Sequence, residues 1–172
     1  MSENTTKKFC AFIVGDGESR LELEQLTTEL GLSYAAAPQH KTEEGATPQL
    51  IFTSWRRDID CVNAGMDIIA LTSFNEGTPV SLIEAQAAGK PIVSTNVGGI
   101  SDVILKDQSA FLVPTDDVTA FVEKLAMLID DDNLRLKFSS VGWPFVQSKF
   151  HYRRLVDDMS SFYEELLRNK SR

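Results

Sequence analysis

Short apolar runs alternate with segments of helical periodicity along most of this 172-residue sequence, and this alternation constrains the fold more than any other feature. The runs typical of strands are residues 7–14, 50–54, 66–73, 90–95 and 109–113. The helical segments are residues 18–32, 58–65, 79–88, 99–105, 117–131, 133–141 and 152–169. Strands separated by helices pair in parallel. The pattern therefore predicts an α/β fold in a single domain over residues 1–172, a doubly wound, Rossmann-like sheet of about five strands.

Residues 34–49 interrupt this alternation with a mixture of proline, glycine, glutamine and charged side chains. Such a composition buries too little apolar surface to offset the entropy of ordering the chain. We therefore expect an exposed, flexible loop in this segment.

The overall composition excludes several classes of protein. The chain has 17 Lys+Arg and 25 Asp+Glu residues, and its net charge of −8 argues against a surface that binds nucleic acid or an anionic membrane. The apolar runs are too short to span a bilayer, and the first residues lack an export signal, so we expect a cytoplasmic protein. Cys10, Cys61, His40 and His151 lack the spacing of metal ligands. We therefore expect no metal site and two buried, reduced thiols.

Ligands of doubly wound sheets bind at the carboxyl ends of the strands. The loops to inspect therefore follow the strands, at residues 15–19, 54–58, 73–78 and 95–100. The first loop begins like a dinucleotide-binding loop, but Arg20 occupies the place of the third glycine, so this signal is weak. In the second loop, Arg56 and Arg57 are candidates for contact with a phosphate or a base, although a solvated turn explains them equally well.

The third loop leads into a helix whose limits are well marked. Thr78 is expected as its N-cap, Pro79 as its first helical residue, and Gly89 as its end. The amino end of this helix offers unpaired N–H groups and a positive dipole end to an anion. Gly77, just before it, lets the backbone approach a ligand closely.

Two carboxylates flank the start of this helix. Glu76 lies in the loop, and Glu84 lies inside a helix that is otherwise apolar nearly all round. Carboxylates accept hydrogen bonds from paired sugar hydroxyls, so this arrangement suits a ligand with phosphates in the middle and a sugar at each side. The alternative for Glu84 is a half-exposed position or an ion pair with Lys90 or an arginine.

Gly98 and Gly99 follow the strand at 90–95 and stand at the start of the next helix. Two glycines there permit the backbone to approach a phosphate or a sugar. A plain tight turn explains the same pair, so both interpretations stay open.

The stretch FNEGTPVSLIEAQAAGKPIVSTNVGGISDVI, residues 74–104, closely resembles the donor-binding half of the retaining group 1 glycosyltransferases of the GT-B fold. The motif of that family is two glutamates separated by seven residues, in the context E-G-x-P-x-x-x-x-E-A-x-A-x-G-x-P-V. This sequence matches it at Glu76, Gly77, Pro79, Glu84, Ala85, Ala87, Gly89 and Pro91, with Ile92 in the last place. The similarity extends to residues 14–32, 55–59 and 150–167, whereas 34–49 replaces a link that is usually shorter.

The resemblance implies a role for each candidate residue. Glu76 would be the catalytic residue, in contact with hydroxyls of the donor sugar, and Glu84 would hold the ribose hydroxyls. The other donor-binding positions would be Gly77, Thr78, Pro79, Gly98, Gly99, Arg56 and Arg57. The donor substrate would be a nucleotide-diphosphate sugar, with no cofactor and no required metal.

Two parts of these enzymes have no counterpart in the sequence. One is the first Rossmann-like domain, which carries the acceptor site and a contributing histidine. The other is an arginine and a lysine that grip the diphosphate, since Lys7 and Lys8 do not match that motif. We therefore interpret the chain as the carboxyl-terminal, donor-binding domain, truncated at its front and inactive alone. The partners would be a nucleotide sugar, an acceptor glycan or lipid-linked sugar in the intact enzyme, and a missing amino-terminal half or a second copy of the chain.

Two further interpretations compete with this one. The chain could be a non-catalytic binding or interaction module derived from such an enzyme, which the missing parts favour. A signalling receiver domain has a similar size, acidity and fold class, but it needs an acidic pair after its first strand and a lone aspartate after its third. Residues 15–17 and Glu76 fit that pattern poorly.

Overall fold

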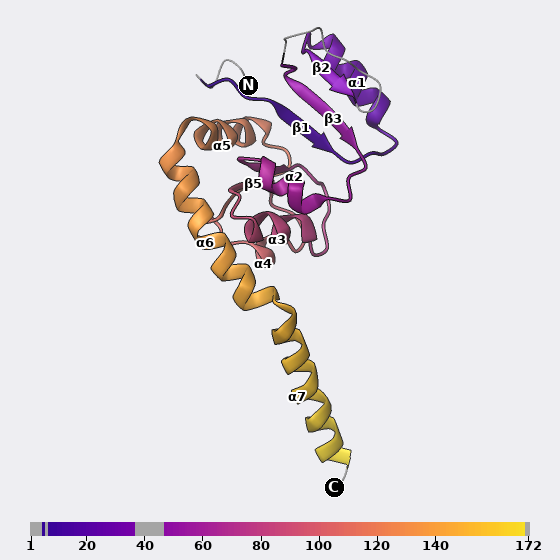
Figure 1. The fold of residues 1–172 in the computed structure, drawn as a ribbon, viewed down its shortest axis with the longest axis vertical. Helices are drawn as coiled ribbons and strands as arrows, with labels where there is room; N and C mark the ends of the chain where they lie inside the picture. Colours follow the sequence, from indigo (N-terminus) through magenta and orange to yellow (C-terminus); the bar gives the residue numbers. More distant parts are fainter. Residues whose placement is uncertain (1–4, 6, 37–46, 171–172) are drawn as a thin grey trace. The chain divides into compact units, whose positions relative to one another are not determined.

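The computed structural model describes residue 5 and residues 7–36 and 47–170. The chain divides into two compact units, which are described separately (Figure 1). The first unit is Thr6–Ile59, and the second unit is Asp60–Arg172 together with Met1–Thr5. The expected flexible loop at 34–49 lies mostly outside the described residues, because 37–46 are not among them.

Within its described residues, the first unit contains a three-stranded parallel sheet and one helix. Its strands are β1 (Ala11–Val14), β2 (Tyr34–Ala36) and β3 (Leu50–Ser54), in the order β1-β3-β2, and its helix is α1 (Arg20–Glu29). The expectation of a loop is wrong for β2. Its residues pair with the first three residues of β3, and the ring of Tyr34 packs edge-on against Phe52 with 5.7 Å between the centroids. Aromatic cross-strand contacts of this kind stabilise a short strand that composition alone does not reveal.

The second unit contains a second three-stranded parallel sheet. Its strands are β4 (Ile69–Leu71), β5 (Ile92–Thr95) and β6 (Ala110–Val113), in the order β4-β5-β6. Its helices are α3 (Val80–Ala87), α4 (Ile100–Val103), α5 (Val118–Asp130), α6 (Asp132–Phe150) and α7 (Tyr152–Lys170), and α2 (Ile59–Gly65) begins at the boundary. The parallel α/β class is therefore confirmed. The strands number six among the described residues and form two sheets of three, where one sheet of about five was expected.

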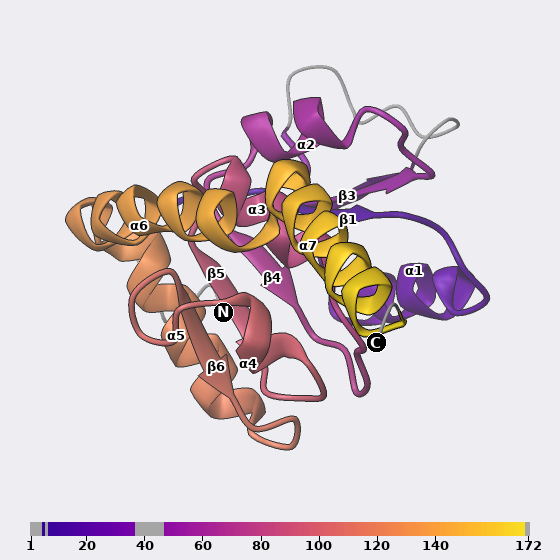
Figure 2. The ribbon, with the colours of Figure 1, turned by 90° about the horizontal axis from the view of Figure 1, so that it is seen from below.

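The core of the second unit lies on both faces of β5, whose four residues are all buried. Ile92 packs with Leu82 of α3 and Ile100 of α4, whereas Val93 packs with Leu128 of α5 and Phe138 of α6. Because successive side chains of a strand point to opposite faces, the sheet is covered by helices on both sides (Figure 2). Such a layered arrangement leaves the carboxyl ends of the strands as the place where loops converge.

Helix α6 is longer than the sequence predicts. It begins after Asp131, whose carboxylate accepts a hydrogen bond from the Leu134 N–H at 2.9 Å, and it runs past Pro144 to Phe150. Proline removes a backbone donor and normally ends a helix. Here the buried side chains of Phe138 and Val146 lie on either side of Pro144 along the helix and hold it against the core.

Helix α7 has no buried residue. Its exposed apolar side chains are Tyr152, Leu155, Val156, Met159, Phe162, Tyr163, Leu166 and Leu167. Within the described part of the chain, no helix combines the length and the apolar character needed to cross a lipid bilayer.

Candidate functional site

The loops after β4 and β5 meet at one edge of the second sheet. The two strands are parallel, with Leu71 opposite Ser94, so both end at the same edge. The Gly99 N–H donates a hydrogen bond to the carbonyl oxygen of Glu76 at 3.2 Å. The predicted site residues Glu76, Gly98 and Gly99 are thus brought together by the direct contact of two strand-end loops.

Both glycines of the second loop are required by this contact. Gly98 has a φ of +51°, and a Cβ atom on it would lie 1.8 Å from the carbonyl oxygen of Glu76. A Cβ atom on Gly99 would lie 2.1 Å from the carbonyl oxygen of Gly77. The space that glycine leaves is therefore occupied by protein backbone, as a tight turn requires. Contact of these two glycines with a ligand stays a prediction.

The Glu76 side chain is held at this edge by a neighbouring serine. Ser73 Oγ donates a hydrogen bond to Glu76 Oε1 at 2.7 Å, and the Ser73 carbonyl accepts one from the buried Thr95 Oγ1 at 2.6 Å. The carboxylate is therefore anchored through Ser73 to the end of β5. Within the described residues its Oε2 makes no hydrogen bond, so one oxygen is left to accept a donor from a ligand.

Helix α3 starts one residue later than predicted. Pro79 is its N-cap, with an extended backbone, and no side chain caps the helix, so the expected capping role of Thr78 is wrong. Its other end is as expected. Gly89 has a φ of +66°, and the N–H groups of Gly89 and Lys90 return to the carbonyls of Gln86 and Ala85 in the Schellman arrangement. The first turn of α3 therefore lacks side-chain acceptors for its N–H groups, whereas its last turn is closed.

Glu84 lies on the exposed side of α3. No ion pair within the described part of the chain includes it, and Lys90 Nζ donates to the carbonyl of Ala64 at 3.1 Å instead. The suggested pair of Glu84 with Lys90 is therefore absent. The carboxylate is solvated and available to a ligand, and it is not an apolar-core residue at all.

The buried polar residue of α3 is Gln86, which the sequence pattern did not single out. Its Nε2 donates to the carbonyl of Val103 at 2.6 Å and to that of Leu82 at 3.1 Å. Its Oε1 accepts from Ser109 Oγ at 2.7 Å, and both side chains are fully buried. The only available signal was spacing, because position 86 shares the face of Leu82 and Ala85.

The two arginines predicted to bind the donor, Arg56 and Arg57, belong to the first unit and follow the end of β3. Arg56 forms an ion pair with Asp58, and its hydrogen bond is the main cause that holds the pKa of the Asp58 carboxyl below its usual range. Arg57 is exposed and makes no ion pair within the described residues. Trp55, beside them, has 77% of its surface exposed. Of the two arginines, Arg57 is the one available to an anion.

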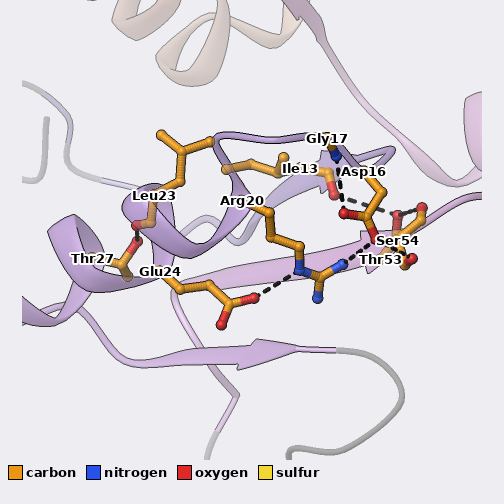
Figure 3. Close-up of polar contacts among 9 residues, drawn as sticks. All are labelled: Ile13, Asp16, Gly17, Arg20, Leu23, Glu24, Thr27, Thr53 and Ser54. Carbon is orange, nitrogen blue, oxygen red and sulfur yellow. Dashed lines mark hydrogen bonds and ion pairs between the residues drawn. The ribbon is translucent and has the colours of Figure 1, made fainter.

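A polar cluster at the start of α1 was missed by the sequence interpretation, which treated 14–19 only as a weak nucleotide loop. Asp16 Oδ2 accepts hydrogen bonds from Ser54 Oγ at 2.6 Å and from Arg20 Nη1 at 3.1 Å (Figure 3). Arg20 Nε donates to Glu24 Oε1 at 2.7 Å. The hydrogen bond from Ser54, with that from the Gly17 N–H and the charge of Arg20, holds the pKa of the Asp16 carboxyl below its ordinary value.

A profile of the family described as "Glycosyl transferases group 1" matches residues 2–131. The chain belongs to this family.

Known relatives of this group 1 glycosyltransferase chain come from several bacteria. It is 27% identical over 158 residues to the Escherichia coli protein named UDP-Gal:alpha-D-GlcNAc-diphosphoundecaprenol alpha-1,3-galactosyltransferase, with 92% of this chain and 37% of the relative covered. It is 30% identical over 161 residues to D-inositol 3-phosphate glycosyltransferase of Corynebacterium jeikeium, with 91% and 35% covered. The chain thus spans little more than a third of the length of these relatives.

Solved structures agree on the domain and the fold. The carboxyl-terminal domain of the group 1 glycosyltransferase LpcC from Francisella tularensis aligns with a TM-score of 0.66 at 26% identity, over 82% of this chain and 69% of that one. Anabaena HepE in complex with UDP-glucose aligns with a TM-score of 0.75 at 21% identity, over 94% and 42%. The chain has the fold of a GT-B carboxyl-terminal domain.

The cysteines of this glycosyltransferase chain differ from expectation. Both are free thiols, but Cys61 is exposed and Cys10 only half-buried, so the prediction of two buried thiols is wrong. Burial is nevertheless the cause that raises the pKa of the Cys10 thiol. No group of three or more His, Cys, Asp or Glu side chains in the described residues has the geometry to hold a metal ion.

Proposed function

We propose that this chain binds a nucleotide-diphosphate sugar as the donor-binding half of a retaining glycosyltransferase. The observation that carries the proposal is the accessibility of two carboxylates, Glu76 in the loop before α3 and Glu84 within the helix. Glu76 is anchored at the sheet edge with one oxygen available, and Glu84 is exposed and unpaired within the described residues. Accessible carboxylates meet the first requirement of the binding role, and an exposed surface position without a ligand is the alternative that the titration below tests.

Each carboxylate has a distinct part in the proposal. Glu84 accepts hydrogen bonds from the ribose hydroxyls, and Glu76 accepts them from hydroxyls of the donor sugar and serves as the catalytic residue. Hydroxyl donors to a carboxylate give charge-assisted hydrogen bonds, which are stronger than neutral ones. The orientation of Glu76 by Ser73 supports this part, because a preorganised acceptor loses little entropy when the sugar arrives.

The diphosphate lies by the backbone at Gly77, Thr78 and Pro79, with Gly98 and Gly99 beside it. The first turn of α3 has N–H groups that no side chain caps, and their partial positive charge suits an anion. When the sugar departs, negative charge grows on the diphosphate, and fixed dipoles aimed there lower the barrier. This part of the task requires no cofactor and no bound metal.

In the first unit, the proposed contact for a nucleotide base is Trp55–Asp58, where Arg57 supplies the available cation and Arg56 is paired with Asp58. A uridine diphosphate sugar is the first donor to test. The E. coli relative is named for UDP-Gal, and the HepE structure holds UDP-glucose.

The complete reaction needs more than this chain, which covers little more than a third of its relatives. We infer that the acceptor, a glycan or a lipid-linked sugar, binds to a separate amino-terminal half, and that the 172 residues alone transfer no sugar. The apolar side chains exposed along α7 are suited to that half or, failing it, to a second copy of the chain. The place of action is the cytoplasm, where nucleotide sugars are available.

Calorimetric titration of the 172-residue chain with UDP, GDP and ADP tests the proposal. We expect one of the three to bind, and Glu84→Gln to weaken it about tenfold, the loss of one hydrogen bond to a charged group. Glu123→Gln, an exposed glutamate on α5, is the matched control and should bind like the wild type. Equal affinity of both variants would refute the role of Glu84.

A non-catalytic module derived from such an enzyme is the second candidate, favoured by the short coverage of the relatives. The two candidates differ in what an added amino-terminal half does. Transfer from the bound nucleotide sugar that appears only when that half is added identifies a donor-binding domain. Binding without transfer, with the half present and folded, identifies a module.

A further inference from the structure

Three segments of the first unit converge on the carboxylate of Asp16 (Figure 3). The turn after β1 contributes the Gly17 N–H, which donates to Asp16 Oδ1 at 2.9 Å. The first turn of α1 contributes Arg20, and the end of β3 contributes Ser54, both of which donate to Oδ2. One side chain thus ties together a turn, a helix and the exit of a strand.

The exit of β3 has an unusual backbone at Ser54. Its φ is +58°, a left-handed conformation that costs energy for any residue with a Cβ atom. The register between β1 and β3 shifts just before it, and the Gly15 N–H donates to the Ser54 carbonyl at 3.1 Å. The chain therefore turns sharply at Ser54, and this turn decides the direction in which residues 55–58 leave the sheet.

Arg20 acts as a brace for Asp16 rather than as a ligand cation. Its guanidinium also donates to Glu24 and lies over the ring of Phe52, 5.7 Å from the centroid. Phe52 is buried, so the Arg20 guanidinium packs against a core residue of the first unit. The carboxylate of Asp16 is therefore held in one orientation before any ligand arrives.

We propose that Asp16 is a positioning residue for the segment Trp55–Asp58. Through Ser54, it fixes the direction of this segment and thereby sets the affinity of the chain for a nucleotide. The inference rests on the proposed function, in which the segment lies by the base of the donor.

The chemistry at this position is specific to a carboxylate. Its two oxygens accept from three donors, the Gly17 N–H, the Ser54 hydroxyl and the Arg20 guanidinium. An asparagine has the same shape, but its amide group carries two donors and only one acceptor oxygen. Asp16→Asn therefore places a donor against a donor, either at the Gly17 N–H or at the Arg20 guanidinium, and we expect it to weaken the cluster that holds Ser54 without leaving a cavity.

The experiment reads the segment through the fluorescence of Trp55. The chain has two tryptophans, so all variants are made in a Trp143→Phe background, which leaves Trp55 as the one emitter. Asp16→Asn and Ser54→Ala are compared with Asp117→Asn, a matched control whose carboxylate accepts from the Ala120 N–H at the start of α5. Steady-state anisotropy, thermal unfolding and titration with UDP are measured for each.

We expect Asp16→Asn to lower the anisotropy of Trp55 at temperatures where the chain stays folded, and to weaken UDP binding about tenfold. Ser54→Ala should do the same, and the double variant should add little, since both act through one hydrogen bond. The control should change neither the anisotropy nor the affinity.

Unchanged anisotropy in both Asp16→Asn and Ser54→Ala overturns the proposal, as does lowered anisotropy with full affinity. Weaker binding with unchanged anisotropy also overturns it, because Asp16 would then act by direct contact. If the wild type binds no UDP, GDP or ADP, the proposed function fails. The anisotropy then still decides whether Asp16 holds the segment, so the two failures are distinguishable.

Discussion

The two units of the chain hold their strands by different means. In the second unit, every residue of β5 is buried, and apolar side chains pack on both of its faces. In the first unit, β1 has no buried residue and β3 has one, Phe52. The polar cluster of Asp16, Arg20, Glu24 and Ser54 joins the helix to the strands instead.

The two kinds of contact differ in how they respond to pH and to substitution of a single side chain. Burial of apolar surface is non-directional and insensitive to pH, so the second unit gives its loops a fixed base. A network of charged hydrogen bonds depends on protonation and on each partner, so the first unit can lose its geometry through a single side chain. The contrast predicts that substitutions at the tightly packed positions of the second unit change stability, whereas those in the polar cluster of the first unit change the placement of Trp55–Asp58.

The largest effect is expected at the contact of the two strand-end loops in the second unit. Gly98→Ala places a Cβ atom 1.8 Å from the Glu76 carbonyl, at a residue with a positive φ. Backbone cannot yield as a flexible side chain does, so we expect a loss of about 3 kcal/mol or more in the free energy of unfolding. Urea denaturation measures it.

Gly77→Ala is the matched control for this prediction, because nothing lies within 4 Å of a Cβ atom placed there. Its stability should stay within about 0.5 kcal/mol of the wild type. If Gly98→Ala is as stable as Gly77→Ala, then the two strand-end loops are not in contact as described. Their contact would then not explain how Glu76 is held at the edge of the sheet.

A smaller loss is expected from the buried hydrogen bonds of α3. Gln86→Leu removes the hydrogen-bond donor of the buried Val103 carbonyl, whereas Ser109 Oγ keeps its hydrogen bonds with the backbone of Leu105. Unsatisfied buried groups cost about 1–3 kcal/mol, so the urea midpoint should fall accordingly. Gln147→Leu, at an exposed position of α6, should leave the midpoint unchanged. Equal midpoints for the two variants would contradict the network.

Much of the second unit was predictable because its signals are local. Apolar runs located β4, β5 and β6 within a few residues. Gly89 was predicted to end α3 because glycine is the residue type favoured at that position. The continuation of α6 through Pro144 was not predictable, since packing of Phe138 and Val146 against the core overrides the local signal.

The first unit was less predictable because its contacts are distant in sequence. Asp16 meets Ser54 across 38 residues, and no periodicity marks such a pair. The strand at 34–36 is too short for an alternation to be seen. At the site itself, residue types predicted the edge where Glu76 and the two glycines meet, but not that the glycines serve a protein contact, because that depends on the approach of two backbones.

We expect pH to have a moderate effect on stability, and this effect should be confined to the first unit. The pKa of Asp16 is lowered by Ser54, Gly17 and Arg20. A lowered pKa contributes stability that is present above the unfolded value of about 3.9 and is lost as the pH falls through the folded value. The carboxylate of Glu24 also faces Arg20, as the acceptor of its Nε–H.

Hydrogen exchange tests this prediction when the rates at each pH are corrected for the intrinsic exchange rate of the amides. Protection of amides in residues 20–29 should be constant from pH 7 to about 5 and should fall below about pH 4, before protection of β5 falls. Asp16→Asn should remove most of this pH dependence. Simultaneous loss of protection in both units would show that the polar cluster is not what distinguishes them.

The smallest effect on stability is expected at Glu84, although its effect on binding is large. The side chain is exposed and alanine has the higher helix propensity, so Glu84→Ala should change the free energy of unfolding by less than about 0.5 kcal/mol. If Glu84 accepts one or two hydrogen bonds from ribose, each worth about 1.5–3 kcal/mol, nucleotide binding should fall tenfold to a hundredfold, at about 1.4 kcal/mol per decade. Thermal unfolding with and without millimolar UDP measures both quantities on one sample. A large drop in melting temperature without ligand would reject the binding role, because it would mean that α3 uses this carboxylate to hold the second unit together.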